Sequence, residues 1–446
     1  MNKTYEFTAP CHFGLEAVLK REITDLGYDV ASTDNGRVSF SGDAEALVRA
    51  NVWLRTAERV LLNVGEFQAV TFDELFEETA ALPWEEFLPR DARFWVTKAT
   101  SVNSKLFSTS DIQSIMKKAM VRRLGAHYGQ EHFEETGAAY PVRVFVHNDT
   151  VSVGIDTSGA SLHKRGYRTE TVKAPITETL AAALILLTPW HKDRILVDPF
   201  CGSGTFPIEA AMMAAHMAPG MNREFTSQLW DNLVPRKCWY EVLDEARDLL
   251  DLQVETDIQG YDADPAVIRM AMKNAEQAGV AGLIHFQQRP VSELSHAKKY
   301  GFLITNPPYG ERLMSGETEE VEALYRTLGE RFRALDDWSL YLITGFPGAE
   351  RAIGRKADKK RKVYNGMMRT WFYTFAGQKP PKRHRALPEE EAGNPAARNG
   401  KAGDPAPRSV GAGNQAPRNG KAGDPAPRDS RAGRRAVPGG KAGGRK

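Results

Sequence analysis

Residues 194–206 read RILVDPFCGSGTF: a short apolar run, then an aspartate, a glycine-rich loop and the start of a run rich in alanine and methionine. The apolar run predicts a buried strand at residues 195–197, and the helix formers at residues 208–215 predict a helix directly after the loop. Glycines between a strand and a helix let a ligand approach the backbone, and the helix N-terminus adds a positive dipole end. This order predicts an α/β domain with a ligand-binding loop at the carboxyl end of a strand.

The residues of this loop narrow the choice of ligand. A dinucleotide-binding loop would have a third glycine three residues after Gly204, where this chain has Pro207, and the Gly-Lys-Ser/Thr of a P-loop is absent. Asp198 would repel a pyrophosphate but attract an ammonium group. S-adenosylmethionine carries an ammonium, a sulfonium and no phosphate, so the loop favours it as the cofactor. The expected cofactor-binding residues here are Asp198, Phe200, Gly202, Ser203, Gly204 and Thr205.

A second acidic segment, YDADP at residues 261–265, follows another strand-like run. A carboxylate at the end of the second strand commonly binds ribose hydroxyls, so we expect Asp262 to bind the ribose and Asp264 to cap the next helix. Either aspartate is able to serve as the cap. Residues 217–253, between the two acidic segments, indicate an inserted helical excursion and a candidate wall of the site.

The stretch FLITNPPYG at residues 302–310 predicts a buried strand that ends in a rigid loop. Neither proline donates a backbone hydrogen bond, and the second restricts the first to an extended conformation. The loop therefore presents unpaired carbonyls and the amide oxygen of Asn306, an array suited to gripping an exocyclic –NH2 by its hydrogens. Tyr309 offers a ring for base stacking, worth roughly 1–3 kcal/mol. The catalytic candidates are Asn306, Pro307, Pro308 and Tyr309; taken alone, the motif is equally compatible with a plain Pro-Pro turn.

These three segments, in this order, resemble class I S-adenosylmethionine-dependent methyltransferases that act on exocyclic amines. Residues 162–168 (LHKRGYR) and 174–181 (APITETLA) are similar to the lead-in of bacterial 23S rRNA guanine-N2 methyltransferases with a THUMP domain, and residues 104–108 and 111–114 resemble a THUMP segment. The resemblance covers residues 1–377. One departure follows the third strand, where an acidic residue near the adenine is common and this chain has QQRP at 287–290; Gln288 and a backbone group are the two candidate substitutes.

The resemblance implies four regions. A small α+β, ferredoxin-like domain occupies residues 1–65 and a THUMP domain residues 66–157. A Rossmann-like methyltransferase domain with a mainly parallel seven-stranded sheet occupies residues 160–378, and a disordered tail residues 380–446. It also implies methyl transfer to guanine N2 in 23S rRNA or a large-subunit precursor.

Local patterns predict individual elements. In the N-terminal part we expect strands at residues 5–8, 37–40, 93–98, 142–147 and 150–156, the last two joined by a turn at Asn148-Asp149, and helices at 14–26, 72–81 and 110–124. In the C-terminal part we expect strands at residues 195–197, 258–261, 283–286, 302–305 and 340–344, followed by a hairpin with a type I′ turn at Asn365-Gly366.

Basic residues predict contacts with RNA phosphates. The candidates are Lys164, Arg165, Arg168, Lys359, Lys360 and Arg361. From residue 380 onward the chain has fifteen Lys and Arg against six Asp and Glu and almost no large apolar residues, which predicts disorder. A solvated charged face and a solubilising linker are the alternatives for these segments.

The composition excludes several classes of protein. The three cysteines have no Cys-x-x-Cys spacing, so neither a disulfide framework nor a zinc or other metal site is expected, and Cys201 is expected to pack in its loop. No signal peptide and no membrane-spanning run is predicted, which indicates a cytoplasmic protein. The rival functions are an N6-adenine methyltransferase acting on RNA or DNA, a protein glutamine-N5 methyltransferase and a non-catalytic RNA-binding factor.

Overall fold

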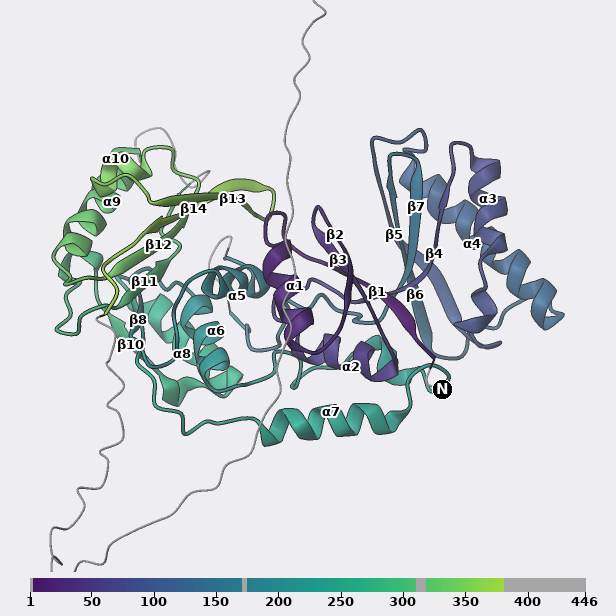
Figure 1. Ribbon diagram of the computed structural model, residues 1–446, viewed down its shortest axis with the longest axis horizontal. Helices are drawn as coiled ribbons and strands as arrows, with labels where there is room; N and C mark the ends of the chain where they lie inside the picture. The colour runs from purple at the N-terminus through teal and green to yellow at the C-terminus, as the bar shows by residue number, and fades with distance from the viewer. Residues whose placement is uncertain (1–2, 171–174, 310–317, 381–446) are drawn as a thin grey trace, which may run out of the picture. The chain divides into compact units, whose positions relative to one another are not determined.

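The computed structural model describes residues 3–170, 175–309 and 318–380, and within them two seven-stranded sheets (Figure 1). The tail for which we predict disorder lies, from residue 381 onward, outside the residues that the structure describes. Within the described ranges, no helix is both long and apolar enough to cross a membrane.

The N-terminal sheet has the strand order β2-β3-β1-β4-β7-β6-β5. Its strands are β1 (Tyr5–Pro10), β2 (Val30–Asp34), β3 (Arg37–Gly42), β4 (Leu61–Gln68), β5 (Arg93–Val102), β6 (Ala139–His147) and β7 (Thr150–Asp156). Its helices are α1 (Glu16–Asp25), α2 (Ala44–Trp53), α3 (Phe72–Ala81) and α4 (Thr109–Tyr128). The sequence predicted most of these but missed β2, β4 and α2.

Strand β4 explains how the two predicted N-terminal units share one sheet. It pairs with β1 on one side and with β7 on the other. The expected boundary between residues 65 and 66 therefore falls inside a strand. The β6–β7 turn is as predicted: Asn148 and Asp149 have φ of 51° and 63°, the positive values that a type I′ turn requires at both central positions.

The C-terminal sheet has the order β10-β9-β8-β11-β12-β14-β13. The first five strands are parallel to one another. Strand β14 is antiparallel to both of its neighbours, β12 and β13. The sheet is therefore mainly parallel and seven-stranded, as predicted. The strands are β8 (Leu196–Asp198), β9 (Ile258–Asp262), β10 (Ile284–Gln288), β11 (Phe302–Thr305), β12 (Ser339–Thr344), β13 (Lys359–Asn365) and β14 (Met368–Phe375). The helices are α5 (Glu178–Leu186), α6 (Thr205–Ala214), α7 (Arg236–Asp248), α8 (Pro265–Ala278), α9 (Thr318–Arg333) and α10 (Ala349–Ile353).

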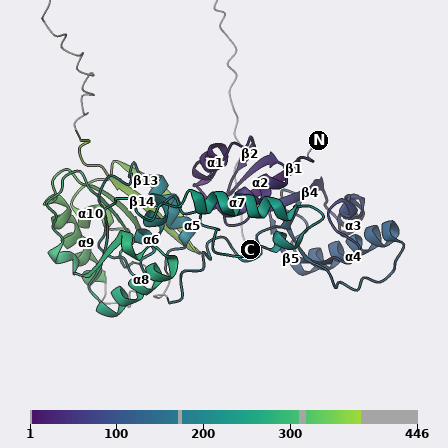
Figure 2. The same cartoon turned by 90° about the horizontal axis from the view of Figure 1, so that it is seen from below.

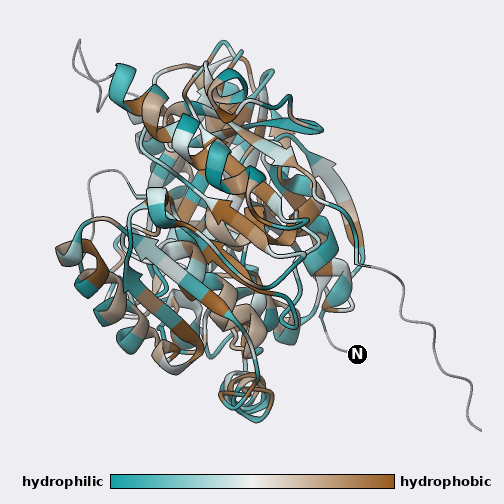
Figure 3. Ribbon diagram, turned by 90° about the vertical axis from the view of Figure 1, so that its left-hand side faces the viewer, coloured by the Kyte–Doolittle hydropathy of each residue, from teal (hydrophilic) through white to brown (hydrophobic). Residues whose placement is uncertain are grey.

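Alternate residues of the central strands serve two hydrophobic cores, one on each face of this sheet. Ile304 of β11 packs in the core that contains α5, α6 and α8, whereas its neighbour Leu303 packs in the core that contains α9 and α10. Figure 3 shows the hydrophobic residues concentrated in these central strands. Burial on both faces explains why these strands read as short continuous apolar runs in the sequence.

The turn between β13 and β14 differs from the prediction by one residue. Asn365 pairs with Met368, so the two turn residues are Gly366 and Met367. Of these only Gly366 has a positive φ, 61°, so the turn is not the type I′ turn that was expected. Asn365 instead belongs to strand β13, and its side-chain amide donates to the Tyr309 hydroxyl.

The inserted segment is helical, as predicted, but it does not form a wall of the site. Helix α7 packs on α2, where the Arg49 guanidinium binds the Glu245 carboxylate through two hydrogen bonds. The Trp230 ring stacks on Tyr140 with 4.7 Å between centroids, and its Nε1 donates to the Ala139 carbonyl. The segment thus completes the core of the N-terminal sheet, and Figures 1 and 2 show α7 beside α2 in both views.

Candidate functional site

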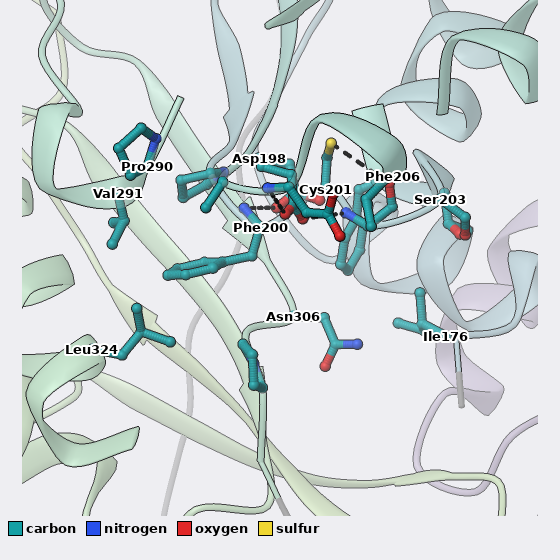
Figure 4. Close-up of a pocket in the computed structure, with 18 of the residues that line it drawn as sticks. Ile176, Asp198, Phe200, Cys201, Ser203, Phe206, Pro290, Val291, Asn306 and Leu324 are labelled. Atoms are coloured by element: carbon teal, nitrogen blue, oxygen red, sulfur yellow. Dashed lines mark hydrogen bonds between the residues drawn. The ribbon is translucent and has the colours of Figure 1, made fainter. Parts of the chain in front are cut away.

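A cavity of about 640 Å³ opens at the carboxyl ends of β8, β9 and β11, where the loops containing Asp198, Asp262 and Asn306 meet. This is where ligands bind in open α/β sheets. Figure 4 shows Asn306 lying between Phe200 and Ile176, across from the loop that carries Asp198 and Cys201. The structure therefore brings together residues from three motifs that are spread over more than 100 positions of the sequence.

The charges around the cavity have one sign. Its charged lining residues are Asp198, Asp262, Asp264 and Glu320, and the described part of the lining contains no Lys or Arg. Such a site would repel a polyphosphate ligand and would favour a cationic one. An ammonium and a sulfonium on one small molecule fit this set of charges, as the loop sequence predicted.

Asp198 is the most deeply buried of these acids, with 2% of its surface exposed. Its Oδ1 accepts hydrogen bonds from the Thr305 hydroxyl at 2.6 Å and the Phe200 amide at 3.1 Å. Burial raises the pKa of Asp198 to about 7, although both hydrogen bonds act in the opposite direction. A bound cation would favour its charged form.

Asp264 performs the capping that the sequence predicted, whereas the ribose contact expected of Asp262 stays a prediction. Asp264 caps α8 by accepting from the Ala266 amide at 2.7 Å. Asp262 accepts from the Gly202 amide at 3.2 Å, which fastens the glycine-rich loop to the end of β9, and it also accepts from the Asp264 amide at 3.1 Å. Burial raises the pKa of the Asp262 carboxyl.

Gly204 has a different role from the one expected. It begins α6 with φ +85° and does not line the cavity, whereas Gly202, Ser203 and Thr205 do. A Cβ there would lie 3.1 Å from Cβ of Ala271 and 3.2 Å from the Phe286 ring. The glycine is thus required for packing of α6 against its neighbours and for its backbone conformation. Cys201, as expected, is buried against Ile268 and Ala271.

Two residues that the sequence did not assign to the loop hold it in place. Asn274 of α8, fully buried, donates from Nδ2 to the Ser203 carbonyl at 3.0 Å. Arg168 donates from Nη2 to the Thr205 hydroxyl at 2.8 Å. A buried asparagine on an otherwise apolar helix face was the available sequence signal for Asn274.

The loop after β11 carries an unusual buried atom. Oδ1 of Asn306 is buried and accepts no hydrogen bond from any residue in the described ranges. Leaving a buried acceptor unpaired costs about 1–3 kcal/mol. Seven other buried side-chain atoms in the described ranges also lack a hydrogen-bond partner, but of the eight only that of Asn306 belongs to a residue lining the cavity, where a ligand would supply one. Asn306 and Pro308 line the cavity.

Neighbouring elements fix the rest of this loop. The Tyr325 hydroxyl of α9 donates to the Pro308 carbonyl at 3.3 Å and lies 2.6 Å from the Thr344 hydroxyl. Tyr309 is 8% exposed, and its hydroxyl accepts from Nδ2 of Asn365 at 3.1 Å. Neither Pro307 nor Tyr309 is among the lining residues, so Tyr309 adjoins the cavity through its chain neighbour.

Helix α9 closes the cavity opposite the glycine-rich loop through Glu320, Ala323, Leu324 and Thr327. We did not predict this helix from the sequence. Its signal was present, because Val321, Tyr325, Leu328 and Phe332 recur at helical spacing and are all buried in one core.

The structure does not bring Gln288 to the cavity. Its side chain is exposed and donates to the Ala263 carbonyl at 3.3 Å, while Pro290, Val291 and Ser292 line this side.

Arg165 contradicts its assignment as an RNA contact. It is 4% exposed, donates to the Arg55 and Leu162 carbonyls and pairs with the fully buried Glu209 at 3.4 Å. Arg168 is also turned inward, since it pairs with Glu178 at 3.2 Å. A phosphate cannot reach the buried Arg165 guanidinium, and that of Arg168 is half-buried. The other candidates, Lys164, Lys359, Lys360 and Arg361, are exposed, although Arg361 donates to the Gly14 carbonyl.

No group of three or more His, Cys, Asp or Glu side chains in the described ranges is arranged to hold a metal ion.

Comparison with known proteins gives consistent matches along the chain. Residues 165–373 match the family described as RMKL-like, methyltransferase domain, residues 6–61 match the RlmL ferredoxin-like domain, and residues 69–156 match the THUMP domain. The putative RNA methyltransferase YpsC of Bacillus subtilis strain 168 is 44% identical over 385 residues, which cover 86% of this chain and 99% of that protein.

The ribosomal RNA large subunit methyltransferase K/L of Syntrophotalea carbinolica is 34% identical over 390 residues, covering 84% of this chain and 54% of that protein. The chain therefore spans about half the length of this relative. Among solved structures, SMU.472, a putative methyltransferase complexed with SAH, has 42% identity and a TM-score of 0.80, covering 85% of this chain and 100% of that one.

Proposed function

This chain belongs to the RMKL-like, S-adenosylmethionine-dependent methyltransferases that carry a THUMP domain, and we propose that it methylates the exocyclic N2 amine of a guanosine in 23S rRNA. The observation that carries the proposal is the buried, unpaired amide oxygen of Asn306 beside a cavity with acidic walls. The first needs a donor such as an –NH2, and the second suits a cationic cofactor. The ribosomal RNA substrate of the K/L relatives supports the choice of RNA.

We assign the cofactor to the acidic part of the cavity. S-adenosylmethionine supplies an electrophilic methyl group on its sulfonium. Asp198 would pair with the cofactor ammonium, and Asp262 would accept from the ribose hydroxyls while keeping the glycine-rich loop in place. Ser203 and Thr205, together with the ring of Phe200, line the space between them.

The Asn306 loop would act on the base. Guanine N2 is a weak nucleophile because its lone pair is delocalised into the ring. Hydrogen bonds from the amine to Oδ1 of Asn306 and the Pro307 carbonyl favour a tetrahedral nitrogen and stabilise the positive charge that develops on it during attack. Tyr309 would stack on the base and fix the line of attack. The base must leave any helix to reach this loop.

The other parts of the proposal concern RNA capture and location. We assign residues 1–65 and 66–157 to the ferredoxin-like and THUMP domains, residues 160–378 to catalysis and residues 380–446 to a tail. The exposed Lys164, Lys359, Lys360 and Arg361 would attract RNA phosphates. The protein would act in the cytoplasm, on 23S rRNA or a large-subunit precursor.

The test is transfer of labelled methyl to 23S rRNA from a strain that lacks this protein, followed by nucleoside analysis. We expect N2-methylguanosine with the wild type and no product with Asn306→Ala, whose cofactor affinity by calorimetry should equal that of the wild type. If the product were N6-methyladenosine, the target atom would be adenine N6 instead of guanine N2, and the proposed mechanism would still apply. Full activity of Asn306→Ala would refute the mechanism.

A further inference from the structure

The turn between β13 and β14 presents an isolated apolar side chain to solvent. Met367 is 99% exposed, more than any other large hydrophobic residue in the described ranges. Among the described residues, nothing lies within 4 Å of the position that a Cβ on its neighbour Gly366 would occupy. Met272 of α8, with 45% exposure, provides a comparison on the same domain.

This turn adjoins the loop that would receive the base. Asn365, two residues before Met367, donates its side-chain amide to the Tyr309 hydroxyl at 3.1 Å. The Tyr309 ring also lies against Gly345, where a Cβ would be 3.0 Å from Cδ2. Tyr309, which follows Asn306 in its loop, thus contacts both Asn365 beside the turn and Gly345 after β12. These two contacts fix the position of the turn relative to the Asn306 loop.

The hairpin is also positively charged. Lys359, Lys360, Arg361, Lys362 and Arg369 are exposed on its two strands, and none of the exposed residues of the hairpin is acidic. Phosphates on either side of a bound nucleotide would be attracted to these strands. An apolar tip flanked by cations matches a structured RNA, which has stacked bases inside and phosphates outside.

On the basis of the proposed function, we infer that Met367 is a wedge that enters the base stack beside the target nucleotide. It fills the space that the target base leaves when that base turns out toward Asn306. Apolar side chains, methionine among them, serve in this way between base steps of bent duplexes. The wedge would offset part of the unstacking free energy that base flipping requires. It therefore matters only for a target held in a helix.

The test uses two substrates of one sequence. Once nucleoside analysis has located the methylated guanosine, an oligoribonucleotide around it is assayed alone and annealed to its complement. We expect Met367→Ser to lower kcat/KM on the annealed substrate by about tenfold, and to stay within about twofold of the wild type on the single strand. Met367→Leu should keep the activity, and Met272→Ser, the matched control, should match the wild type on both.

A fluorescent 2-aminopurine next to the target reports unstacking directly. The wild type and Met367→Leu should raise its fluorescence in the annealed substrate, and Met367→Ser should raise it much less. Equal kcat/KM of Met367→Ser and the wild type on the annealed substrate would overturn the wedge, as would an equal loss on both substrates or a wild type active on the single strand alone. A wild type that methylates no RNA removes the proposed function and the wedge together.

Discussion

At the scale of single residues, Asp262 and Asp264 show how two similar side chains two positions apart differ in role. Both line the cavity, but Asp264 uses its carboxylate to cap α8, whereas Asp262 holds the Gly202 amide and is the residue to which we assign the ribose. Asp262→Ala should therefore weaken S-adenosylmethionine binding, since hydrogen bonds to a charged acceptor contribute about 1.5–3 kcal/mol each. Calorimetry measures this affinity.

The matched control is Asp264→Ala. Loss of a helix cap should lower the free energy of unfolding by about 1 kcal/mol and leave the affinity nearly unchanged. If affinity for the cofactor were lost only in Asp264→Ala, the ribose-binding role would belong to Asp264.

Asp198 gives the site a pH dependence whose sign follows from its raised pKa. Between the ordinary value of 3.8 and about 7 the folded, ligand-free protein keeps a proton on this carboxyl that the unfolded chain releases. This contribution to the free energy of unfolding therefore falls as the pH rises through that window and is constant above it. Binding of a cation favours the carboxylate, so S-adenosylmethionine affinity should fall as the pH drops below about 7.

Thermal unfolding and calorimetry from pH 5 to 8 test both effects against Asp198→Asn, which has no proton to exchange. The two proteins should differ in their pH profiles of stability and affinity. Parallel profiles would show that Asp198 is charged throughout the range.

At the scale of elements, one hydroxyl of α9 contacts the loop after β11, to which we assign the substrate base. Tyr325, fully buried, donates to the Pro308 carbonyl and neighbours the Thr344 hydroxyl. Tyr325→Phe should lower kcat for methyl transfer severalfold, because the loop loses the bond that fixes Asn306 relative to the cavity. Cofactor affinity should be unchanged.

Tyr128→Phe is the matched control, because its hydroxyl donates to the Leu88 carbonyl in the N-terminal part at 2.7 Å. Each variant loses a hydroxyl-to-carbonyl bond worth about 1 kcal/mol of stability, and Tyr325→Phe also loses the contact with the Thr344 hydroxyl. An equal decrease of kcat in the two would mean that the effect is one of stability and not of loop position.

The elements also show which features a sequence can predict. β11 matches its predicted bounds because a buried strand between a glycine and a Pro-Pro turn has a local signature, and α3 does so because Thr71 and Glu74 form a capping box. The turn after β13 was misplaced by one residue, since Asn365-Gly366 satisfies the local rule while pairing across the strands decides the register.

The candidate site divides in the same way. The residues of the two loops, Asp198 and Asn306, follow from local motifs. The inward orientation of Arg165 does not, because its partners Glu209 and Arg55 lie 44 and 110 positions away. A run of charges in a sequence does not reveal which of its members meets a buried carboxylate.

At the scale of the whole molecule, the composition of the tail makes a prediction. Residues 380–446 have too few large apolar residues to form a core. Their deletion should leave Tm and cofactor affinity nearly unchanged and, if they attract phosphates, should weaken RNA binding chiefly at low salt. Differential scanning fluorimetry and RNA titrations at two salt concentrations measure these effects. A fall of Tm by several degrees would show that the segment packs on the body of the protein.

The insertion that carries Trp230, Trp239 and Ala246 has a consequence for how the protein folds during its synthesis on the ribosome. These side chains belong to the core of the N-terminal sheet, whose own last strand ends at Asp156. At roughly 5–20 residues per second, the ribosome takes several seconds to move from the end of that strand to the end of the insertion. During this interval the nascent sheet exposes apolar surface that only later-made residues cover. The N-terminal sheet therefore cannot complete its core when its last strand has been made, and the interval before the insertion follows is when a chaperone would have most to bind.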